Sequence, residues 1–162
     1  MIPEIRKILF TTDLSDQSRI SLSWAMAIAR KHDAHLLMLN VIEDISSSSS
    51  VQVYFSEQEW NELKKRIDNE AKGVMQKRLE AFCDEVKNEI PQCTYVADEI
   101  LVRRGNPVEK IIDTAKQNGC DIIVMGTHGT GGLTDTLMGS TARRVLRRSD
   151  IPVFVVPVRP AR

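Results

Sequence analysis

The sequence has 162 residues, of which 42% are hydrophobic and 27% charged, the balance of one ordinary globular domain. Its 22 Lys and Arg residues equal its 22 Asp and Glu residues, so no basic surplus indicates nucleic-acid binding. No apolar run approaches about 18 residues, and the N-terminus lacks the layout of a signal peptide. The three cysteines indicate neither a disulfide framework nor a zinc site. We expect a single cytoplasmic domain over residues 1–162 that binds neither membrane, nucleic acid nor its own metal.

The first elements in chain order are a strand, a helix and a second strand. Residues 7–12 form a short apolar run that predicts a strand, and Asp13–Asp16 is a cluster of residues favoured as helix N-caps. The helix that follows extends to about residue 31. Apolar residues recur at helical spacing on it, and we expect them to mark its amphipathic pattern: Ile20, Trp24, Ala27 and Ile28. Residues 36–42 are apolar on both faces and predict a strand buried on both sides.

The middle of the chain contains a polar loop and a long helix. A run of five serines lies within residues 44–56, which we expect to form a flexible loop. Apolar residues then recur at helical spacing over residues 57–88. Such a helix would be nearly 50 Å long, whereas a domain of this size is about 40 Å across. We therefore expect the helix either to bend near Gly73 or to extend beyond the domain body.

The remaining elements repeat the alternation of strand and helix. We expect strands over residues 97–102, 121–125 and 153–156, and helices over residues 107–118 and 140–148. Five strands that alternate with four helices indicate the α/β class. The predicted architecture is a single doubly wound, parallel, five-stranded sheet with helices on both faces.

The clearest candidate site follows the fourth predicted strand. Gly126 and Gly129 allow the backbone to approach a phosphate closely, and Gly139-Ser140-Thr141 opens the next helix with small and hydroxyl residues. Each feature alone is common in turns and helix caps, but the combination between a buried strand and a helix favours phosphate binding. The sequence has no GxxxxGK[ST] motif, and no GxGxxG motif follows a strand. Kinase-like and dehydrogenase-like mechanisms therefore lack support.

The spacing Gly126-x2-Gly129-x9-Gly139-Ser140 resembles the G-x2-G-x9-G-[ST] ATP-binding signature of the universal stress protein family. The runs 8–13 and 151–157 agree with that family, and the resemblance covers Pro3 to Pro157. It implies a Rossmann-like fold of the adenine nucleotide alpha hydrolase-like type. It also implies ATP, with Mg²⁺ as a candidate companion ion, as the ligand. By this resemblance the nucleotide-binding residues are Thr11, Thr12, Asp13, Val41, Met125, Gly126, His128, Gly129, Gly139, Ser140 and Thr141.

The role of Asp13 has two interpretations. A carboxylate repels phosphates but accepts hydrogen bonds from a ribose hydroxyl or an adenine amino group, which favours contact with the nucleoside. Alternatively, Asp13 caps the following helix, a role that Asp16 fills equally well.

The last predicted strand is a candidate interface. It is apolar on both faces and lies at the end of the sequence, where an exposed edge needs a partner or a cover. The family resemblance implies a homodimer formed by antiparallel pairing of this strand, through Val153, Phe154, Val155 and Val156. The alternative is an edge shielded within its own chain.

The sequence favours a nucleotide-dependent stress-response or signalling module that binds ATP and acts through a homodimer rather than by fast catalysis. Two alternatives remain open. One is a slow ATPase or autophosphorylating enzyme, although the sequence has no evident general base, loop lysine or metal cluster. The other is a dimeric scaffold that binds no nucleotide. The sequence indicates no particular protein partner.

Overall fold

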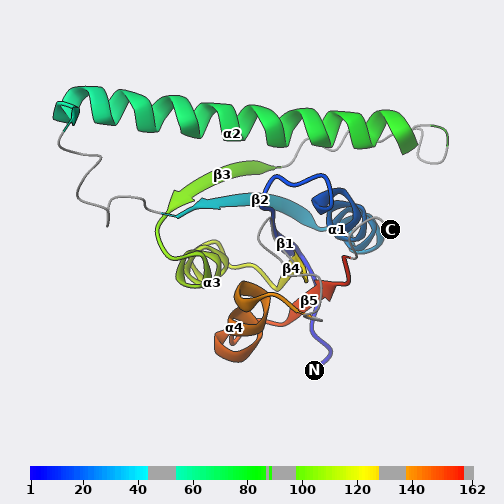
Figure 1. The fold of residues 1–162 in the computed structure, drawn as a ribbon. Helices are drawn as coiled ribbons and strands as arrows, with labels where there is room; N and C mark the ends of the chain where they lie inside the picture. Colours follow the sequence, from blue (N-terminus) through cyan, green and yellow to red (C-terminus); the bar gives the residue numbers. More distant parts are fainter. Residues whose placement is uncertain (44–53, 87, 89–97, 128–137, 159–162) are drawn as a thin grey trace.

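The computed structural model describes residues 1–43, 54–86, 88, 98–127 and 138–158 (Figure 1). Its strands and helices fall within two residues of the bounds expected from sequence. In chain order they are β1 (Lys7–Thr11), α1 (Ser18–His32), β2 (His35–Ile42), α2 (Glu57–Val86), β3 (Glu99–Arg104), α3 (Pro107–Gln117), β4 (Ile122–Gly126), α4 (Ser140–Arg148) and β5 (Val153–Val156).

The strands form one parallel sheet in the order β3-β2-β1-β4-β5. Leu9 at the centre of β1 lies opposite Leu37 on one side and Ile123 on the other. The chain adds β2 and β3 on one side of β1, then returns to add β4 and β5 on the other. This reversal places the topological switch point between β1 and β4, where doubly wound folds bind their ligands. The predicted fold class is confirmed.

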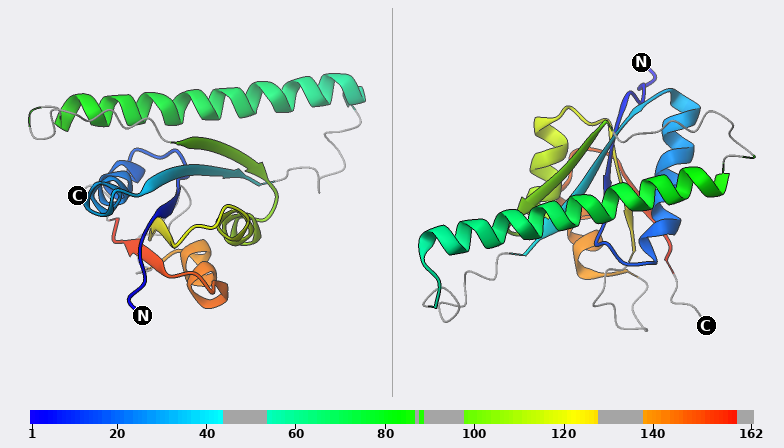
Figure 2. Two further views of the ribbon diagram at one scale, coloured as in Figure 1. Left: turned by 180° about the vertical axis from the view of Figure 1, so that it is seen from behind. Right: turned by 90° about the horizontal axis from the view of Figure 1, so that it is seen from above.

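Two layers of helices cover the sheet, α1 and α2 on one face and α3 and α4 on the other (Figures 1 and 2). Successive residues of each strand point to opposite faces, so the strands serve both cores. Ile8 and Phe10 pack with α1 and α2, whereas Leu9 packs with α3 and α4. Each of these three side chains is at most 1% exposed, which explains why the strands are apolar on both faces.

The helix expected from the spacing of Ile20, Trp24, Ala27 and Ile28 is present as α1, but these residues do not form its buried face. Ile20 and Trp24 are 46% and 51% exposed, and Ala27 is also exposed, while Ile28 is partly buried. Smaller residues bring the helix close to the sheet, and the buried face consists of Ser18, Ser21, Leu22, Ala25, Met26 and Ala29. Trp24 instead lies against Phe154 of β5, with 5.7 Å between ring centroids. The predicted stripe is therefore a second apolar strip, on the outer side of α1.

The predicted N-cap of α1 is also wrong. The helix begins at Ser18 after Gln17, and among the described residues no side chain accepts a capping hydrogen bond there. Asp13 does not cap the helix, because its carboxylate accepts hydrogen bonds from the amide and hydroxyl of Ser15 instead. The predicted start of α3 is confirmed, because Pro107 is the first residue of this helix. Asn106 caps it by accepting hydrogen bonds from the amides of Val108 and Glu109.

Helix α2 is continuous through Gly73, and its N-terminal end extends past the sheet (Figures 1 and 2). Among the α2 residues whose side chains the structure describes, those that are buried are Ala71, Met75 and Leu79, and none precedes the middle of the helix. The second of the two expected arrangements, a helix whose first turns extend beyond the body, is therefore the one observed. Most of the predicted serine-rich loop, residues 44–53, lies outside the described residues. No helix within the described ranges is both long and apolar enough to cross a membrane.

Candidate nucleotide site

A cavity of about 520 Å³ lies at the carboxyl ends of β1 and β4, next to the switch point. Residues from several separate segments line it, as expected where strand order reverses. His128 and Gly129 lie outside the described residues. The other nine residues predicted to bind nucleotide all line this cavity: Thr11, Thr12, Asp13, Val41, Met125, Gly126, Gly139, Ser140 and Thr141.

The end of β1 is fixed by its neighbour β2. The amide of Thr12 donates to the carbonyl of Leu39 at 2.9 Å, and the carbonyl of Thr12 accepts from Nδ2 of buried Asn40, also at 2.9 Å. The hydroxyl of Thr12 accepts from the amide of Leu14 at 3.1 Å. Both backbone polar groups of Thr12, the residue before Asp13, are thus held by hydrogen bonds, which positions Asp13 at the cavity wall.

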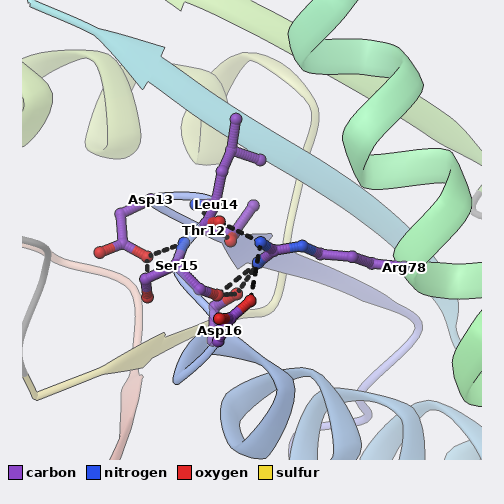
Figure 3. Close-up of polar contacts among 7 residues, drawn as sticks. Thr12, Asp13, Leu14, Ser15, Asp16 and Arg78 are labelled. Carbon is purple, nitrogen blue, oxygen red and sulfur yellow. Dashed lines mark hydrogen bonds and ion pairs between the residues drawn. The ribbon is translucent and has the colours of Figure 1, made fainter.

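The carboxylate of Asp13 has one engaged oxygen and one unengaged oxygen (Figure 3). Oδ1 accepts from the backbone amide of Ser15 at 3.0 Å and from its hydroxyl at 2.7 Å. Oδ2 is buried and has no hydrogen-bond partner among the described residues. A buried polar atom without a partner is costly, so this oxygen is an acceptor available to a ligand in the cavity.

The N-terminus of α4 supplies the opposite electrostatic character. Its N-cap is Gly139, which has no side chain to accept from the amides of the first turn. The amide of Gly139 itself donates to the carbonyl of Thr127 at 2.6 Å, which fixes where the helix starts. First-turn amides and the helix dipole favour an anion at this end, and the hydroxyls of Ser140 and Thr141 add donors.

A third part of the lining is apolar. Val41 follows the buried part of β2, Met125 lies near the end of β4, and Pro107 and Ile111 come from α3. Glu43 lines the same cavity and is exposed. The cavity therefore combines an apolar wall, a carboxylate acceptor and a helix N-terminus, the mixture that small-molecule sites use for affinity and orientation.

Half of the lining residues are not indicated by any pattern used to predict the site from the sequence. Ser18 and Ser21 resemble helix-cap residues in the sequence, and Asn40 is concealed within an apolar strand. The hydroxyl oxygen of Ser21 is buried with no hydrogen-bond partner in the described part of the chain. The signal that could have found Ser18 and Ser21 is their spacing of three on the buried face of α1. The missed residues are Ser18, Ser21, Asn40, Glu43, Pro107, Ile111, Thr127, Ala142 and Val158.

The candidate interface strand, β5, lies at the edge of the sheet and pairs with β4 on its inner side. Val156 is buried, Val153 and Val155 are partly buried, and Phe154 is 36% exposed. Within the described residues no strand pairs with the outer side of β5, so its edge is open there.

The sequence matches the model of the universal stress protein family over residues 4–157. The chain belongs to the universal stress protein family. Among curated relatives, universal stress protein MJ0577 of Methanocaldococcus jannaschii is 29% identical over 153 residues, which cover 93% of this chain and 94% of the relative. Universal stress protein MJ0531 of the same organism is 31% identical over 151 residues, covering 93% and 81% of the two chains.

Solved structures place this universal stress protein in the same fold. The structure of MJ0577 superimposes with a TM-score of 0.74 at 30% identity, covering 98% of this chain and all of that one. Universal stress protein UspA from Lactobacillus plantarum has a TM-score of 0.63 at 26% identity, covering 96% and 99%. A universal stress protein crystallised in complex with cAMP has a TM-score of 0.59 at 18% identity, covering 95% and 98%, a likeness that shows the fold alone.

Proposed function

We propose that the chain is a cytoplasmic, ATP-binding universal stress protein, a nucleotide-dependent stress-response module that acts through a homodimer rather than by fast catalysis. One observation carries the proposal: a single cavity contains both the unpartnered Oδ2 of Asp13 and the glycine-capped N-terminus of α4. The carboxylate oxygen can accept a hydrogen bond from a hydroxyl or amino group of a ligand, and the N-terminus of α4 can bind its phosphates.

The lining divides naturally between the parts of ATP. Gly139, Ser140 and Thr141 hold the phosphates, with or without Mg²⁺, together with the glycine segment that begins at Gly126. Asp13 accepts from the ribose or the adenine amino group, because a carboxylate repels phosphates. The apolar wall formed by Val41 and its neighbours takes the base. In this proposal His128 and Gly129 complete the segment that binds the phosphates. The walls of the cavity are completed by Thr11, Thr12 and Met125.

Two further observations support this assignment. A cavity of about 520 Å³ is within the range of about 300–1,000 Å³ typical of small-molecule sites. One protein of the same fold was crystallised in complex with cAMP, an adenine nucleotide. For the homodimer, the support is the open edge of β5 with Phe154 exposed on it, since an apolar edge strand favours pairing with another chain.

The decisive experiment measures binding directly. We expect freshly purified protein to carry ATP, ADP or AMP, identified by mass after denaturation, or the nucleotide-free protein to release heat on titration with Mg-ATP. Gly139→Val should weaken ATP binding at least about tenfold, because a β-branched side chain narrows the cavity beside the first-turn amides.

The matched control is Gly73→Ala, a glycine replacement on α2 that lines no part of the cavity and should leave the affinity unchanged. Unchanged ATP affinity of the Gly139→Val variant would place the ligand elsewhere. Absence of both copurified nucleotide and titration heat would contradict ATP binding and favour the scaffold alternative. Steady phosphate release from bound ATP would instead favour the slow-ATPase alternative.

A further inference from the structure

No described side chain of α2 lines the cavity, yet Arg78 of this helix holds the loop that follows Asp13 (Figure 3). The guanidinium of Arg78 donates to the backbone carbonyls of Leu14 and Ser15 and, at 2.8 Å, to the hydroxyl of Ser18. It also pairs with the carboxylate of Asp16 at 3.6 Å. The Arg78 side chain is only 21% exposed, so its hydrogen bonds to Leu14, Ser15 and Ser18 are made largely out of water, whereas the Asp16 side chain is fully exposed.

The loop of residues 14–16 has a backbone conformation that is unfavourable without contacts from outside the loop. Leu14 has φ of 66°, in the left-handed region that L side chains rarely adopt. Such a conformation persists only where surrounding contacts determine it. Arg78 supplies two of those contacts, at the consecutive carbonyls of Leu14 and Ser15. A planar fork with several donors suits two adjacent carbonyls, which a single ammonium group does not match as well.

The same loop residue connects Arg78 to the cavity. The carbonyl of Ser15 accepts a hydrogen bond from Arg78. The amide and hydroxyl of Ser15 donate to Oδ1 of Asp13. The orientation of Ser15 therefore sets the rotation of the Asp13 carboxylate, and that rotation determines where the unpartnered Oδ2 lies. Removing the Arg78 guanidinium releases Ser15, and the direction of Oδ2 is then no longer fixed.

We infer that Arg78 is a positioning residue for nucleotide binding: it holds the loop of residues 14–16 so that Oδ2 of Asp13 meets the nucleoside. The inference rests on the proposed function, because it concerns the same cavity. It also makes α2 part of the site's machinery, since by linkage a ligand that needs the positioned Asp13 stabilises the contact between α2 and this loop. A purely architectural role for Arg78 would fasten α2 to the domain without affecting the ligand.

The chain offers a matched control for this distinction. Arg19 of α1 pairs with Glu85 of α2, and the two side chains are 57% and 56% exposed. This pair also bridges two helices of one layer, but neither residue lines the cavity. Arg19→Met therefore removes another guanidinium contact between α1 and α2 and leaves the side-chain contacts of the loop of residues 14–16 in place.

The test is titration of the full-length protein with Mg-ATP at a temperature where circular dichroism shows every variant to be folded. We expect Arg78→Met to raise Kd about tenfold, Arg78→Lys to raise it less, and Arg19→Met to leave it within about twofold. If Arg78→Met does not fold, Arg78→Lys takes its place, since it keeps the charge and loses the fork. Equal Kd for wild type and the Arg78 variant would overturn the inference and leave the proposed function standing.

A double-mutant cycle supplies the readout that an architectural role does not move. In an Asp13→Asn background, Arg78→Met should change Kd by less than about twofold, because the carboxylate that it positions is already gone. A full tenfold effect in that background would show that Arg78 acts independently of Asp13 and would overturn the inference. Wild-type protein that binds no ATP overturns the proposed function and this inference with it.

Discussion

Ser15 holds one carboxylate oxygen of Asp13 with two donors at once, its amide at 3.0 Å and its hydroxyl at 2.7 Å. The second oxygen of that carboxylate is buried and unpartnered in the described part of the protein. An aspartate anchored on one side in this way cannot rotate to satisfy both oxygens locally. The structure thus keeps an unpaired acceptor on a residue of the cavity wall, and the position of this acceptor depends on Ser15.

Replacement of Ser15 tests this relationship. Ser15→Ala removes the hydroxyl donor but keeps the backbone donor, so the Asp13 carboxylate gains rotational freedom without losing its anchor entirely. We expect Kd for Mg-ATP to rise about three- to tenfold, or about 0.7–1.4 kcal/mol, less than a full hydrogen bond to a charged group because the backbone donor remains. Isothermal titration calorimetry measures the change. Ser23→Ala is the control, because in the described part of the chain the Ser23 hydroxyl bonds to the carbonyl of Ile20 on the exposed side of α1 and to no other group. An unchanged Kd for Ser15→Ala would show that Asp13 is oriented without it.

Two glycines in equally open surroundings should respond oppositely to alanine. A Cβ added at Gly73 or at Gly119 meets no heavy atom within 4 Å. Gly73 lies inside α2, where alanine is favoured by about 0.5–1 kcal/mol, so Gly73→Ala should stabilise the protein by that amount. Gly119 ends α3 at φ of 63°, where alanine is strained, so Gly119→Ala should destabilise it by about 1 kcal/mol. Urea unfolding measures both, and changes of the same sign would contradict this account.

Sequence patterns predicted most of the fold for identifiable reasons. Strands buried on both faces carry unbroken apolar runs such as Leu36–Leu39, and a parallel sheet follows from their alternation with helices. The pattern failed on α1 because that helix has two apolar strips, and the larger side chains of Ile20 and Trp24 lie on the outer one. Hydrophobic periodicity finds an amphipathic helix but does not tell which strip faces the sheet when small residues make the closer contact.

The residues of the candidate site likewise divide into those that local sequence indicated and those that it did not. Asp13 follows β1 and Gly139 precedes α4, so the local sequence was enough to indicate both residues. Both line the cavity. Arg78 bonds to residues 60 to 64 positions away, on a loop that carries no charge pattern pointing to α2. Contacts of this range follow from the packing of α2 on the sheet, which periodicity alone does not specify.

Alkaline conditions should reveal the burial of Cys120. Burial raises the pKa of its thiol from the ordinary 9.0 to about 11, because the thiolate is disfavoured away from water. Between these values the unfolded chain releases the thiol proton while the folded protein keeps it, so stability falls as pH rises through the window. We expect the cysteine to account for about 1 kcal/mol of the loss between pH 8.5 and 10.

The measurement compares wild type with Cys120→Ala, since tyrosines and lysines titrate in the same range in both proteins. The free energy of unfolding from urea denaturation should fall less steeply with pH in the variant. Parallel pH profiles for the two proteins would show that the thiol ionises equally well in the folded and unfolded states.

The open edge of β5 gives a sharp test of the proposed homodimer. The carbonyls of Pro152 and Val156 accept from β4, from the amides of Ile123 and Thr127. Backbone groups alternate in direction along a strand, so the amide of Val155 faces the outer edge. Val155→Pro therefore removes a donor that antiparallel pairing with a second β5 needs, while it spares the hydrogen bonds to β4.

Sedimentation velocity should show a dimer for wild type and a monomer for Val155→Pro. Val155→Thr, which keeps the β-branched shape and the backbone amide, is the matched control and should remain dimeric. A Val155→Pro protein that is folded and still dimeric would place the interface elsewhere, and the outer strip of Ile20 and Trp24 would then be the next surface to test. A monomeric wild type would instead mean that this edge is covered within its own chain, because an apolar strand edge left in water favours pairing.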